Sequence, residues 1–181
     1  MRTDTRNPPI EYAPPKLGDW GNLRHLIEDS FPEITGSHLS YLIRNGMDKM
    51  FVARQGKQLL GFCYFEEISH DGLHLLWLAT DRNHYQHGIA SRLLKHLDSY
   101  ALSNGYKSIA LTVEKDNLAA KRLYEKLGYV LTDDRKAENK ESWVKILTGE
   151  CTEPAIEFGF RANNSYPFRV FKKILYRHLA N

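Results

Sequence analysis

The chain has 181 residues, the length of one domain or of one domain with an appendage. Hydrophobic residues make up 42% and charged residues 26%, near the globular average, which argues against a fibrous or fully disordered chain. The 25 Lys and Arg residues exceed the 22 Asp and Glu residues by three, and this surplus lies in residues 151–181. Because residues 1–150 are then neutral, we do not expect a nucleic-acid-binding body, which would carry a basic stripe on its main fold.

The chain carries no sign of a membrane or secretory segment. No apolar run approaches the ~18 residues that a membrane span requires, and the N-terminus lacks the apolar core of a secretory signal. The two cysteines, Cys63 and Cys151, form no C-x-x-C pair, and Cys63 lies in an apolar run typical of a core thiol. We therefore expect a soluble, cytoplasmic protein with no membrane association.

The N-terminal third is predicted to contain two helices and a β-hairpin. Trp20, Leu23 and Ile27 recur at three- and four-residue steps, which is the spacing of an amphipathic helix. Gly56 separates two apolar runs and is typical of a hairpin turn. After a flexible tail at residues 1–9, we expect a strand, two helices and two strands at residues 10–13, 17–31, 37–44, 50–54 and 58–66.

The rest of the core alternates strands with helices. Ile109, Leu111 and Val113 alternate with small or polar residues, which is the spacing of a strand. Strand–helix–strand units imply parallel neighbours and hairpins imply antiparallel ones, so the predicted fold class is α/β, a mixed sheet with helices on both faces. We expect a strand at 73–80, a loop at 81–87, a helix at 88–103, a strand at 109–113, a helix at 117–127 and a last antiparallel pair at 129–131 and 143–147.

A loop that leads from the third long strand into a helix is the first candidate site. Gly88, Ala90 and Ser91 are small residues at the expected helix start, so a ligand can approach the backbone closely there. Unpaired N–H groups at a helix start bind phosphate or pyrophosphate. The segment is neither a Walker loop nor G-x-G-x-x-G, which argues against nucleotide hydrolysis and dinucleotide redox chemistry. The alternative is structural, since small residues also pack helices against strands.

The segment from Asn117 to Tyr129 is the second candidate site. Asn117 is a helix N-cap residue type that follows a strand. Tyr124 lies two turns into the predicted helix, where its hydroxyl could donate a proton to a leaving group if it faces the site. The alternative is that Tyr124 only contributes to the core.

Together the two segments resemble the GNAT superfamily of N-acetyltransferases. The family's acyl-CoA loop reads [QR]-x-x-G-x-[GA], and this chain matches it with Gly88 and Ala90 but has Tyr85 at the first position. The later family motif, N-x-x-A-x-x-L-Y-x-x-x-G-[FY], is matched in full by Asn117, Ala120, Leu123, Tyr124, Gly128 and Tyr129. The resemblance implies an acetyltransferase domain over residues 10–148, followed by a C-terminal extension at 149–181 that packs on the same domain.

The resemblance also implies where acetyl-CoA binds. The pantetheine arm would run along the backbone of Leu78, Ala79 and Thr80, in a split of the sheet, and Asn117 would touch it. Tyr124 would protonate the departing CoA thiolate. Tyr85 stands where the family motif has a glutamine or arginine, so one side-chain contact to the cofactor would be lost. Backbone N–H groups would still supply most of the anion binding. The pyrophosphate would lie on the N–H groups of Gln86, His87, Gly88, Ile89, Ala90 and Ser91.

The reaction also needs a base, because a protonated amine has no lone pair. His74 is the first candidate: it lies near the start of the central strand, where related histone-type acetyltransferases have a glutamate, and an unperturbed histidine titrates near 6.5. Glu66 and Glu67 on the neighbouring strand are the next candidates. Strand alternation predicts that His74, Leu76, Leu78 and Thr80 share one face. A purely structural role for His74 at the strand end is the alternative.

We expect no metal site. His84 and His87 form H-x-x-H, but no cysteine or carboxylate cluster lies beside them in the sequence. The basic C-terminal extension is expected to form a strand at 156–160 and an amphipathic helix from residue 165, whose aromatic side covers the fold. An acceptor-site wall, a homodimer contact and contact with an acidic partner are the alternatives.

The prediction is an N-acetyltransferase that moves an acetyl group from acetyl-CoA to a primary amine. The acceptor is either a small-molecule amine or an amine of a protein or peptide. Two alternatives stay open: a non-catalytic acyl-CoA-binding regulatory module, and an acyltransferase that acts on aminoacyl-tRNA through the basic extension. The second of these would show salt-dependent RNA binding.

Overall fold

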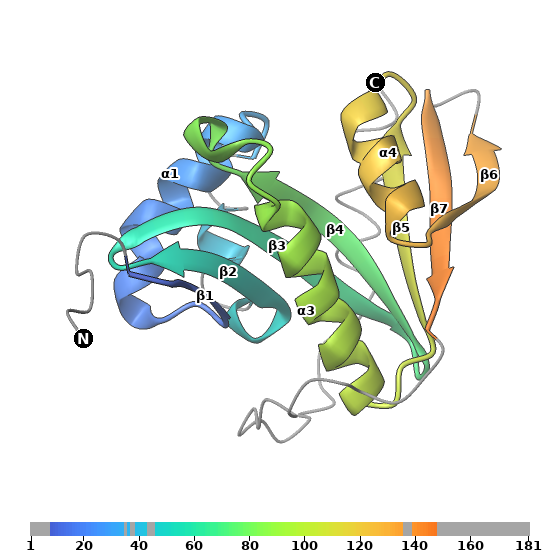
Figure 1. The fold of residues 1–181 in the computed structure, drawn as a ribbon, viewed down its shortest axis with the longest axis horizontal. Coiled ribbons are helices and arrows are strands. Elements are labelled where there is room, and N and C mark those ends of the chain that lie inside the picture. The colour runs from blue at the N-terminus through green and yellow to red at the C-terminus, as the bar shows by residue number, and fades with distance from the viewer. Residues whose placement is uncertain (1–7, 35, 37–38, 43–45, 136–138, 148–181) are drawn as a thin grey trace, which may run out of the picture.

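The computed structural model of the protein describes residues 8–34, 36, 39–42, 46–135 and 139–147. Within these ranges the chain forms a seven-stranded sheet with helices on both faces (Figure 1). The α-helices with defined bounds are α1 (Trp20–Ser30), α3 (Ile89–Ser103) and α4 (Leu118–Lys126), and residues 39–42 are also helical. The strands are β1 (Ile10–Ala13), β2 (Met50–Gln55), β3 (Gln58–Ser69), β4 (Gly72–Thr80), β5 (Ser108–Glu114), β6 (Val130–Arg135) and β7 (Lys140–Ile146).

The sheet is mixed, as predicted. Its strand order is β1-β2-β3-β4-β5-β7-β6, and every neighbouring pair is antiparallel except β4 and β5. Parallel neighbours cannot be joined by a tight turn, so α3 forms the crossover between β4 and β5. The last strand, β7, inserts between β5 and β6, and its antiparallel pairing with β6 confirms the predicted final strand pair.

Two apolar clusters cover the two faces of the sheet. On one face, which we call the α3 face, α3 buries the apolar stripe that its spacing predicted: Ile89, Leu93, Leu94, Leu97 and Ala101. On the other, the α1 face, α1 buries Leu23, Leu26 and Ile27. The strands supply both clusters by alternation, because successive side chains point to opposite faces.

A β-bulge in β4 breaks this alternation. Leu75 lies opposite Phe65 and Trp77 lies opposite Tyr64, so Leu76 is the extra residue between the two registers. Leu76 and Trp77 are consecutive, yet both pack against the α1-face cluster, whereas Leu78 packs against the α3-face cluster. The prediction that His74, Leu76, Leu78 and Thr80 share one face is therefore wrong, because the bulge reverses the faces after Leu76.

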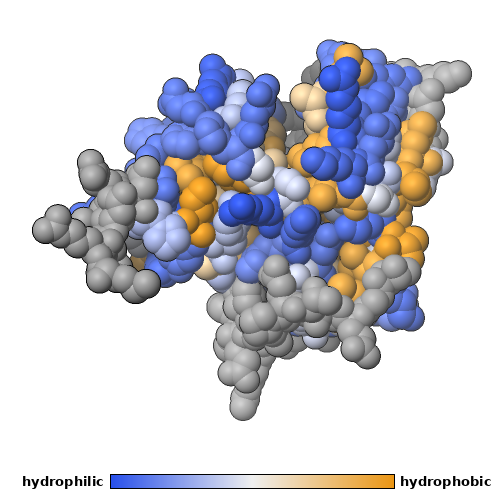
Figure 2. All heavy atoms as spheres, viewed as in Figure 1, coloured by the Kyte–Doolittle hydropathy of each residue, from blue (hydrophilic) through white to orange (hydrophobic). Residues whose placement is uncertain are grey.

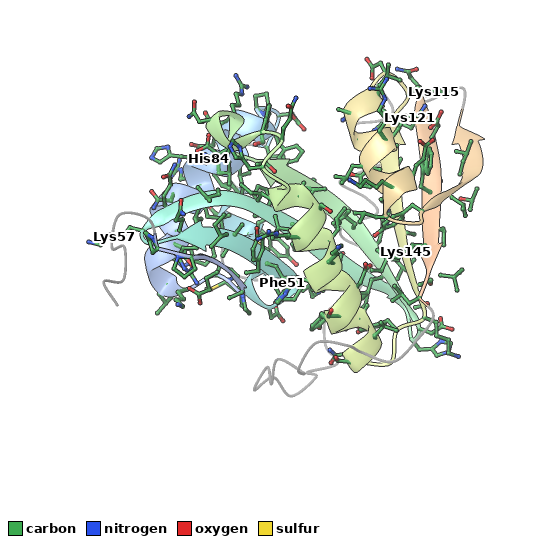
Figure 3. The ribbon with its side chains drawn as sticks, viewed as in Figure 1. Phe51, Lys57, His84, Lys115, Lys121 and Lys145 are labelled. Atoms are coloured by element: carbon green, nitrogen blue, oxygen red, sulfur yellow. The ribbon has the colours of Figure 1, made fainter. Side chains whose placement is uncertain are left out.

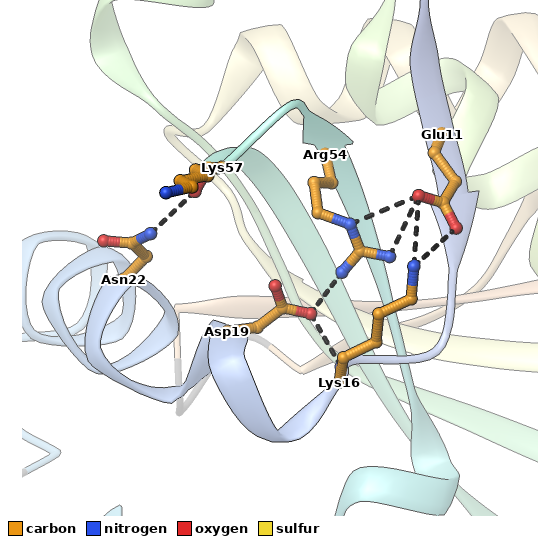
Figure 4. A network of polar contacts seen from close by, with 6 residues as sticks. All are labelled: Glu11, Lys16, Asp19, Asn22, Arg54 and Lys57. Carbon is orange, nitrogen blue, oxygen red and sulfur yellow. Dashed lines mark hydrogen bonds and ion pairs between the residues drawn. The ribbon is translucent and has the colours of Figure 1, made fainter.

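A buried ion-pair network holds the N-terminal segment on the sheet (Figure 4). The guanidinium of Arg54 on β2 is ion-paired to Asp19, just before α1, and to Glu11 on β1, with 3.2 Å between Nη2 of Arg54 and Oε2 of Glu11. Asp19 also accepts a 2.6 Å hydrogen bond from the backbone N–H of Lys16. Because Arg54 is buried, loss of one partner would leave part of its charge uncompensated, so the network fixes β1 and the start of α1 on β2.

The element boundaries differ from the predictions by a few residues. β3 continues to Ser69, and β6 continues to Arg135. The predicted helix at 17–31 begins as a 3-10 turn, Leu17–Asp19, before α1. Within the described residues, no helix is both long enough and apolar enough to cross a membrane. The strand and helix expected in the C-terminal extension lie outside the described residues, as do residues 1–7.

Candidate functional site

The sheet splits where β4 carries its bulge. β4 and β5 pair only from Gly72 opposite Ser108 to Leu75 opposite Leu111. Beyond Leu75, β4 stays with β3 and β5 stays with β7, and the surface is hollowed between the part that contains α1 and the part that contains α4 (Figure 2). The backbone polar groups of 76–80 on the β5 side have no strand partner among the described residues, so they are available to an extended ligand. This is the predicted segment Leu78–Thr80.

The loop after β4 ends in a helix start without a side-chain cap. Gln86 and Gly88 have positive φ values of 64° and 75°, and Gly88 makes no side-chain cap to α3. Among the described residues, the first three N–H groups of α3 therefore have neither a helical acceptor nor a side-chain cap. A Cβ at Gly88 would have no atom within 4 Å, so the approach to these groups is open. This geometry fits the phosphate site predicted over residues 86–91, and Tyr85 beside it is 57% exposed.

Asp81 fixes the first half of this loop. Its Oδ1 accepts a 2.9 Å hydrogen bond from the backbone N–H of Asn83, and its own N–H donates to the carbonyl of Leu60 on β3. Burial acts to raise the pKa of Asp81, but the hydrogen bond from Asn83 and the nearby His84 imidazole outweigh it and lower the pKa. The carboxylate thus stays charged and fixes the loop, while the backbone N–H of Asp81 joins the loop to β3.

Asn117 is the N-cap of α4, as its residue type predicted, and Tyr124 lies two turns into that helix. Oδ1 of Asn117 accepts a 3.1 Å hydrogen bond from the N–H of Ala120 and caps α4. Tyr124 is buried, and it shares the α3-face cluster with Leu78 of β4. Burial raises the pKa of Tyr124 to about 12, so its hydroxyl keeps its proton at neutral pH and can donate it.

An ion pair that the sequence did not point to lies beside this tyrosine. Nζ of Lys145 on β7 lies 2.6 Å from Oδ2 of Asp98 on α3 and 5.8 Å from the ring centroid of Tyr129 (Figure 3). The rings of Tyr129 and Tyr124 are 5.6 Å apart. Burial raises the pKa of Asp98, against the hydrogen bond from Lys145 that lowers it. Lys145 thus joins the far side of the split to α3.

The first two base candidates lie side by side on the α1 face. Glu66 on β3 is directly opposite His74 on β4, and His74 is opposite Ala110 on β5. This is one residue pair before the parallel pairing of β4 and β5 ends. The hydroxyl of Tyr64 donates a 2.5 Å hydrogen bond to Oε1 of Glu66. The structure therefore brings Glu66 and His74 together where the split between β4 and β5 begins.

Glu67, the third base candidate, is not part of this group. It is opposite Leu73, which belongs to the α3-face cluster. Its carboxylate accepts a hydrogen bond from Tyr106, which contributes with burial to raise the pKa of that phenol. Glu67 therefore lies on the other face of the sheet from Glu66 and His74.

Two further features that the sequence singled out are the pair His84 and His87 and the thiol of Cys63. The rings of His84 and His87 are 6.1 Å apart, and in the described parts of the chain no three His, Cys, Asp or Glu side chains lie together as metal ligands. Cys63 is fully buried, and burial raises the pKa of its thiol to about 12. Cys63 is therefore a core thiol, as predicted.

A cavity of about 620 Å³ lies on the other side of β4 from the split. One side of α1, the β2–β3 turn and the start of the β4–α3 loop line it, including His25, Asp29, Lys57 and Arg82. Thr80 is the one residue that it shares with the predicted acetyl-CoA contacts. The uncapped start of α3 belongs to the split and not to this cavity.

A comparison with known protein families identifies the family of this chain. Residues 20–129 match the family described as "Acetyltransferase (GNAT) family". The chain belongs to the GNAT acetyltransferase family. The match spans the hairpin, the split and both sequence motifs, so the family resemblance of the two motifs is confirmed. Comparison with curated protein sequences found no significant match.

Solved structures share the GNAT fold at low sequence identity. Ard1 from Thermoplasma volcanium is 21% identical with a TM-score of 0.68, over 77% of this chain and 99% of that one. PaiA N-acetyltransferase from Thermoplasma acidophilum, crystallised with coenzyme A, is 18% identical with a TM-score of 0.63, over 76% and 99%. The ribosomal-protein-S18-alanine N-acetyltransferase from Escherichia coli is 18% identical with a TM-score of 0.64, over 84% and 100%.

The sequence pointed to neither Tyr64 nor Trp77 as parts of a site. Tyr64 stands two residues before Glu66, and strand alternation places such pairs on one face. That spacing was the available signal for the Tyr64–Glu66 contact. The position of Trp77 had no such signal, because it depends on the bulge at Leu76.

Proposed function

We propose that this GNAT protein transfers the acetyl group of acetyl-CoA to a primary amine by direct attack in a ternary complex. The observation that carries the proposal is the split at Leu76, with Tyr124 on the α3 face and the Glu66–His74 pair on the α1 face. A thioester in the split would have a proton donor on one side and a proton acceptor on the other. Crystals of relatives with coenzyme A support acyl-CoA use.

Each group has a separate task in the reaction. Acetyl-CoA would lie along 78–80, with its phosphates on the N–H groups of 86–91 and Asn117 beside its arm. His74 takes a proton from the ammonium, and the amine nitrogen then attacks the thioester carbon. A backbone N–H near Leu78 stabilises the oxyanion.

Collapse of the tetrahedral intermediate completes the transfer. The C–S bond breaks and the CoA sulfur takes the hydroxyl proton of Tyr124. The new amide nitrogen loses its remaining extra proton, which restores the Tyr124 hydroxyl. The products are the N-acetylated amine, free CoA and the proton held by His74, so atoms and charge balance. Because Tyr124 has a raised pKa, it begins each cycle protonated.

The acceptor is a small-molecule amine or an amine of a protein or peptide. Neighbouring structures are named for both kinds: an N-acetylglutamate synthase from Neisseria gonorrhoeae and a NatC complex bound to a Gag peptide. The Escherichia coli neighbour is named for a ribosomal-protein alanine. These names support a primary-amine acceptor without choosing between the kinds.

Two measurements on the full chain test this function. Calorimetry measures acetyl-CoA binding, and release of CoA thiol measures transfer over panels of aliphatic amines, amino acids and peptides. Binding together with amine-dependent thiol release, and a product heavier by one acetyl group, is the expected result. Binding without release over all panels would instead identify a regulatory acyl-CoA-binding module.

A further inference from the structure

The α1-face side of the split points to the residues that bind the acceptor. We infer that the Glu66 carboxylate binds the ammonium form of the acceptor amine, and that Tyr64 is the positioning residue for that carboxylate. The inference rests on the proposed acetyl transfer. It assigns Glu66 to binding and specificity and leaves proton removal to His74.

The Tyr64–Glu66 contact fixes one oxygen of the carboxylate. Tyr64 is buried, with 2% of its surface exposed. Burial, followed by the hydrogen bond to Glu66, raises the pKa of Tyr64, so the phenol remains a donor at every pH the enzyme meets. With Oε1 bound 2.5 Å from this donor, the carboxylate is held in one orientation. Charge-assisted hydrogen bonds of this kind are strong and directional.

The strand register places this carboxylate beside the proposed base. Glu66 is directly opposite His74, and Cβ atoms of directly opposed residues lie about 4.5–5.5 Å apart. An ammonium bound to Glu66 is therefore within reach of the His74 imidazole. β4 and β5 separate after the next residue pair, Leu75 and Leu111. The same ammonium therefore lies where the split begins.

Aromatic rings pack beside Tyr64, the residue that holds the Glu66 carboxylate. The Trp77 ring lies 5.2 Å from the Tyr64 ring and 5.6 Å from the Phe31 ring. Apolar walls exclude water and lower the local dielectric constant, which increases the attraction between a carboxylate and an ammonium.

The charged groups around this site add to that preference. Asp48, before β2, and Tyr41, in the helical segment 39–42, both act on the Tyr64 phenol and raise its pKa. Two carboxylates, those of Glu66 and Asp48, therefore act on this phenol, and His74 lies opposite Glu66 on the neighbouring strand. The local charge therefore suits a cationic acceptor.

This arrangement makes a chemical distinction between two kinds of primary amine. An aliphatic amine, like the lysine side chain, has a pKa near 10.4 and arrives protonated at neutral pH. An arylamine arrives neutral, gains nothing from the carboxylate and does not need the base. The site should therefore select aliphatic amines, whether free or in a peptide, over arylamines of similar size.

The test compares Glu66→Gln with Glu67→Gln. Glu67 is the next residue on the same strand but lies on the α3 face with Tyr106, so it is a matched control. Steady-state kinetics are measured with panels of aliphatic amines and of arylamines such as aniline. Loss of one charge-assisted contact should raise the KM of the best aliphatic acceptor in Glu66→Gln by about 10- to 100-fold, mainly without loss of kcat. Glu67→Gln should stay within about twofold of the native enzyme, as surface changes usually do.

The Tyr64→Phe variant keeps the ring and removes the donor. It should raise the same KM by about 3- to 10-fold, the effect of one ordinary hydrogen bond. Its acetyl-CoA dissociation constant should not change, which excludes unfolding as the cause. A structural role for Tyr64 would lower the melting temperature without moving KM.

The outcomes separate this inference from the proposed function. Transfer to arylamines as readily as to aliphatic amines would overturn the inference and leave acetyl transfer intact, as would an unchanged KM in Glu66→Gln. A fall in kcat at constant KM in that variant would make Glu66 the base and would also overturn it. Acetyl-CoA binding without transfer to either panel would overturn both.

Discussion

Gly61 on β3 lies so close to Ile89 at the start of α3 that a side chain would not fit between them. A Cβ at position 61 would lie 3.0 Å from Cγ2 of Ile89 and 2.8 Å from the carbonyl oxygen of Ala79 on β4. The same glycine is directly opposite Thr80 in the register of β3 and β4. The start of α3, where we propose the phosphate site, thus packs directly on β3 at the residue that pairs with the end of β4.

The Gly61→Ala variant tests this close approach. Because the methyl group meets backbone on one side, the change should destabilise the protein by about 1–3 kcal/mol, as overpacking does, and should weaken acetyl-CoA binding. Urea unfolding and calorimetry measure the two effects. The control is Gly21→Ala in α1, where a Cβ has no neighbour within 4 Å. It should stabilise the protein by about 0.5–1 kcal/mol. Equal stabilities of the two variants would contradict the packing described.

Tyr124→Phe tests the proton donor. Loss of general acid catalysis should lower kcat by about 100-fold or more, while the acetyl-CoA dissociation constant stays nearly constant because the ring remains in the cluster. Since the pKa of Tyr124 is raised to about 12, the native enzyme should show no loss of kcat from Tyr124 ionisation below pH 10. An unchanged kcat in the variant would remove Tyr124 from the mechanism.

The pair Tyr85→Ala and Gly88→Ala tests what binds the phosphates. The exposed Tyr85 side chain occupies the position of a family contact, but we propose that backbone N–H groups bind the phosphates. Its loss should therefore change the acetyl-CoA dissociation constant by less than about threefold, or about 0.7 kcal/mol. Gly88 has a φ of 75°, where an L-residue is strained by roughly 1–2 kcal/mol, so Gly88→Ala should weaken binding more. Complete loss of binding in Tyr85→Ala would contradict this assignment of the loop.

Glu11→Gln tests the N-terminal network through its pH dependence. The hydrogen bond from Lys16, with Arg54 beside it, lowers the pKa of Glu11 below its ordinary value of 4.5. Because the pKa of Glu11 is lower in the folded state than in the unfolded state, its charge stabilises the protein at pH values above the ordinary pKa of 4.5. This contribution is lost as the pH falls through the lower, folded-state pKa. Glu11 is half exposed, so the variant should lose less than about 1 kcal/mol at pH 7.

The difference between native protein and Glu11→Gln should shrink as the pH falls below 4.5, when measured by denaturant unfolding at several pH values. Glu33→Gln is the control, because Glu33 is exposed in the turn after α1. A difference for Glu11→Gln that does not depend on pH would show that the network acts by packing alone.

Cys63 provides a probe of the core. Its thiol is fully buried and its pKa is raised to about 12, so little reactive thiolate forms at neutral pH. Iodoacetamide should leave Cys63 unmodified in the native protein and modify it in urea, as measured by peptide mass spectrometry. Rapid modification under native conditions would mean that the α3-face cluster opens readily.

Much of this structure follows from short-range sequence patterns. The apolar stripe of α3 and the Asn117 cap of α4 depend only on neighbouring residues, so periodicity and residue type were enough to predict them. Gly88 has a left-handed backbone conformation, which favours the glycine that the motif has at this position. This too is a local feature of the sequence.

The predictions failed where packing across the sheet decides the structure. The bulge at Leu76 is set by the register between β3 and β4, and it reversed the predicted face of Leu78. The sequence made no prediction of the place of β7 between β5 and β6, because that place depends on which strand pairs with β5. The Lys145–Asp98 pair joins β7 to α3, so no pattern along one element could predict it. The Tyr64–Glu66 contact, in contrast, lies within β3 and required only strand alternation. The face of Glu67, opposite to that of Glu66, required only strand alternation.

A crystal structure with acetyl-CoA tests the central claim most directly. We predict that the pantetheine arm lies in the split along 78–80, with the phosphates on the N–H groups of 86–91 and the thioester open toward Glu66 and His74. Acetyl-CoA bound instead in the cavity between α1 and the start of the β4–α3 loop would contradict the account.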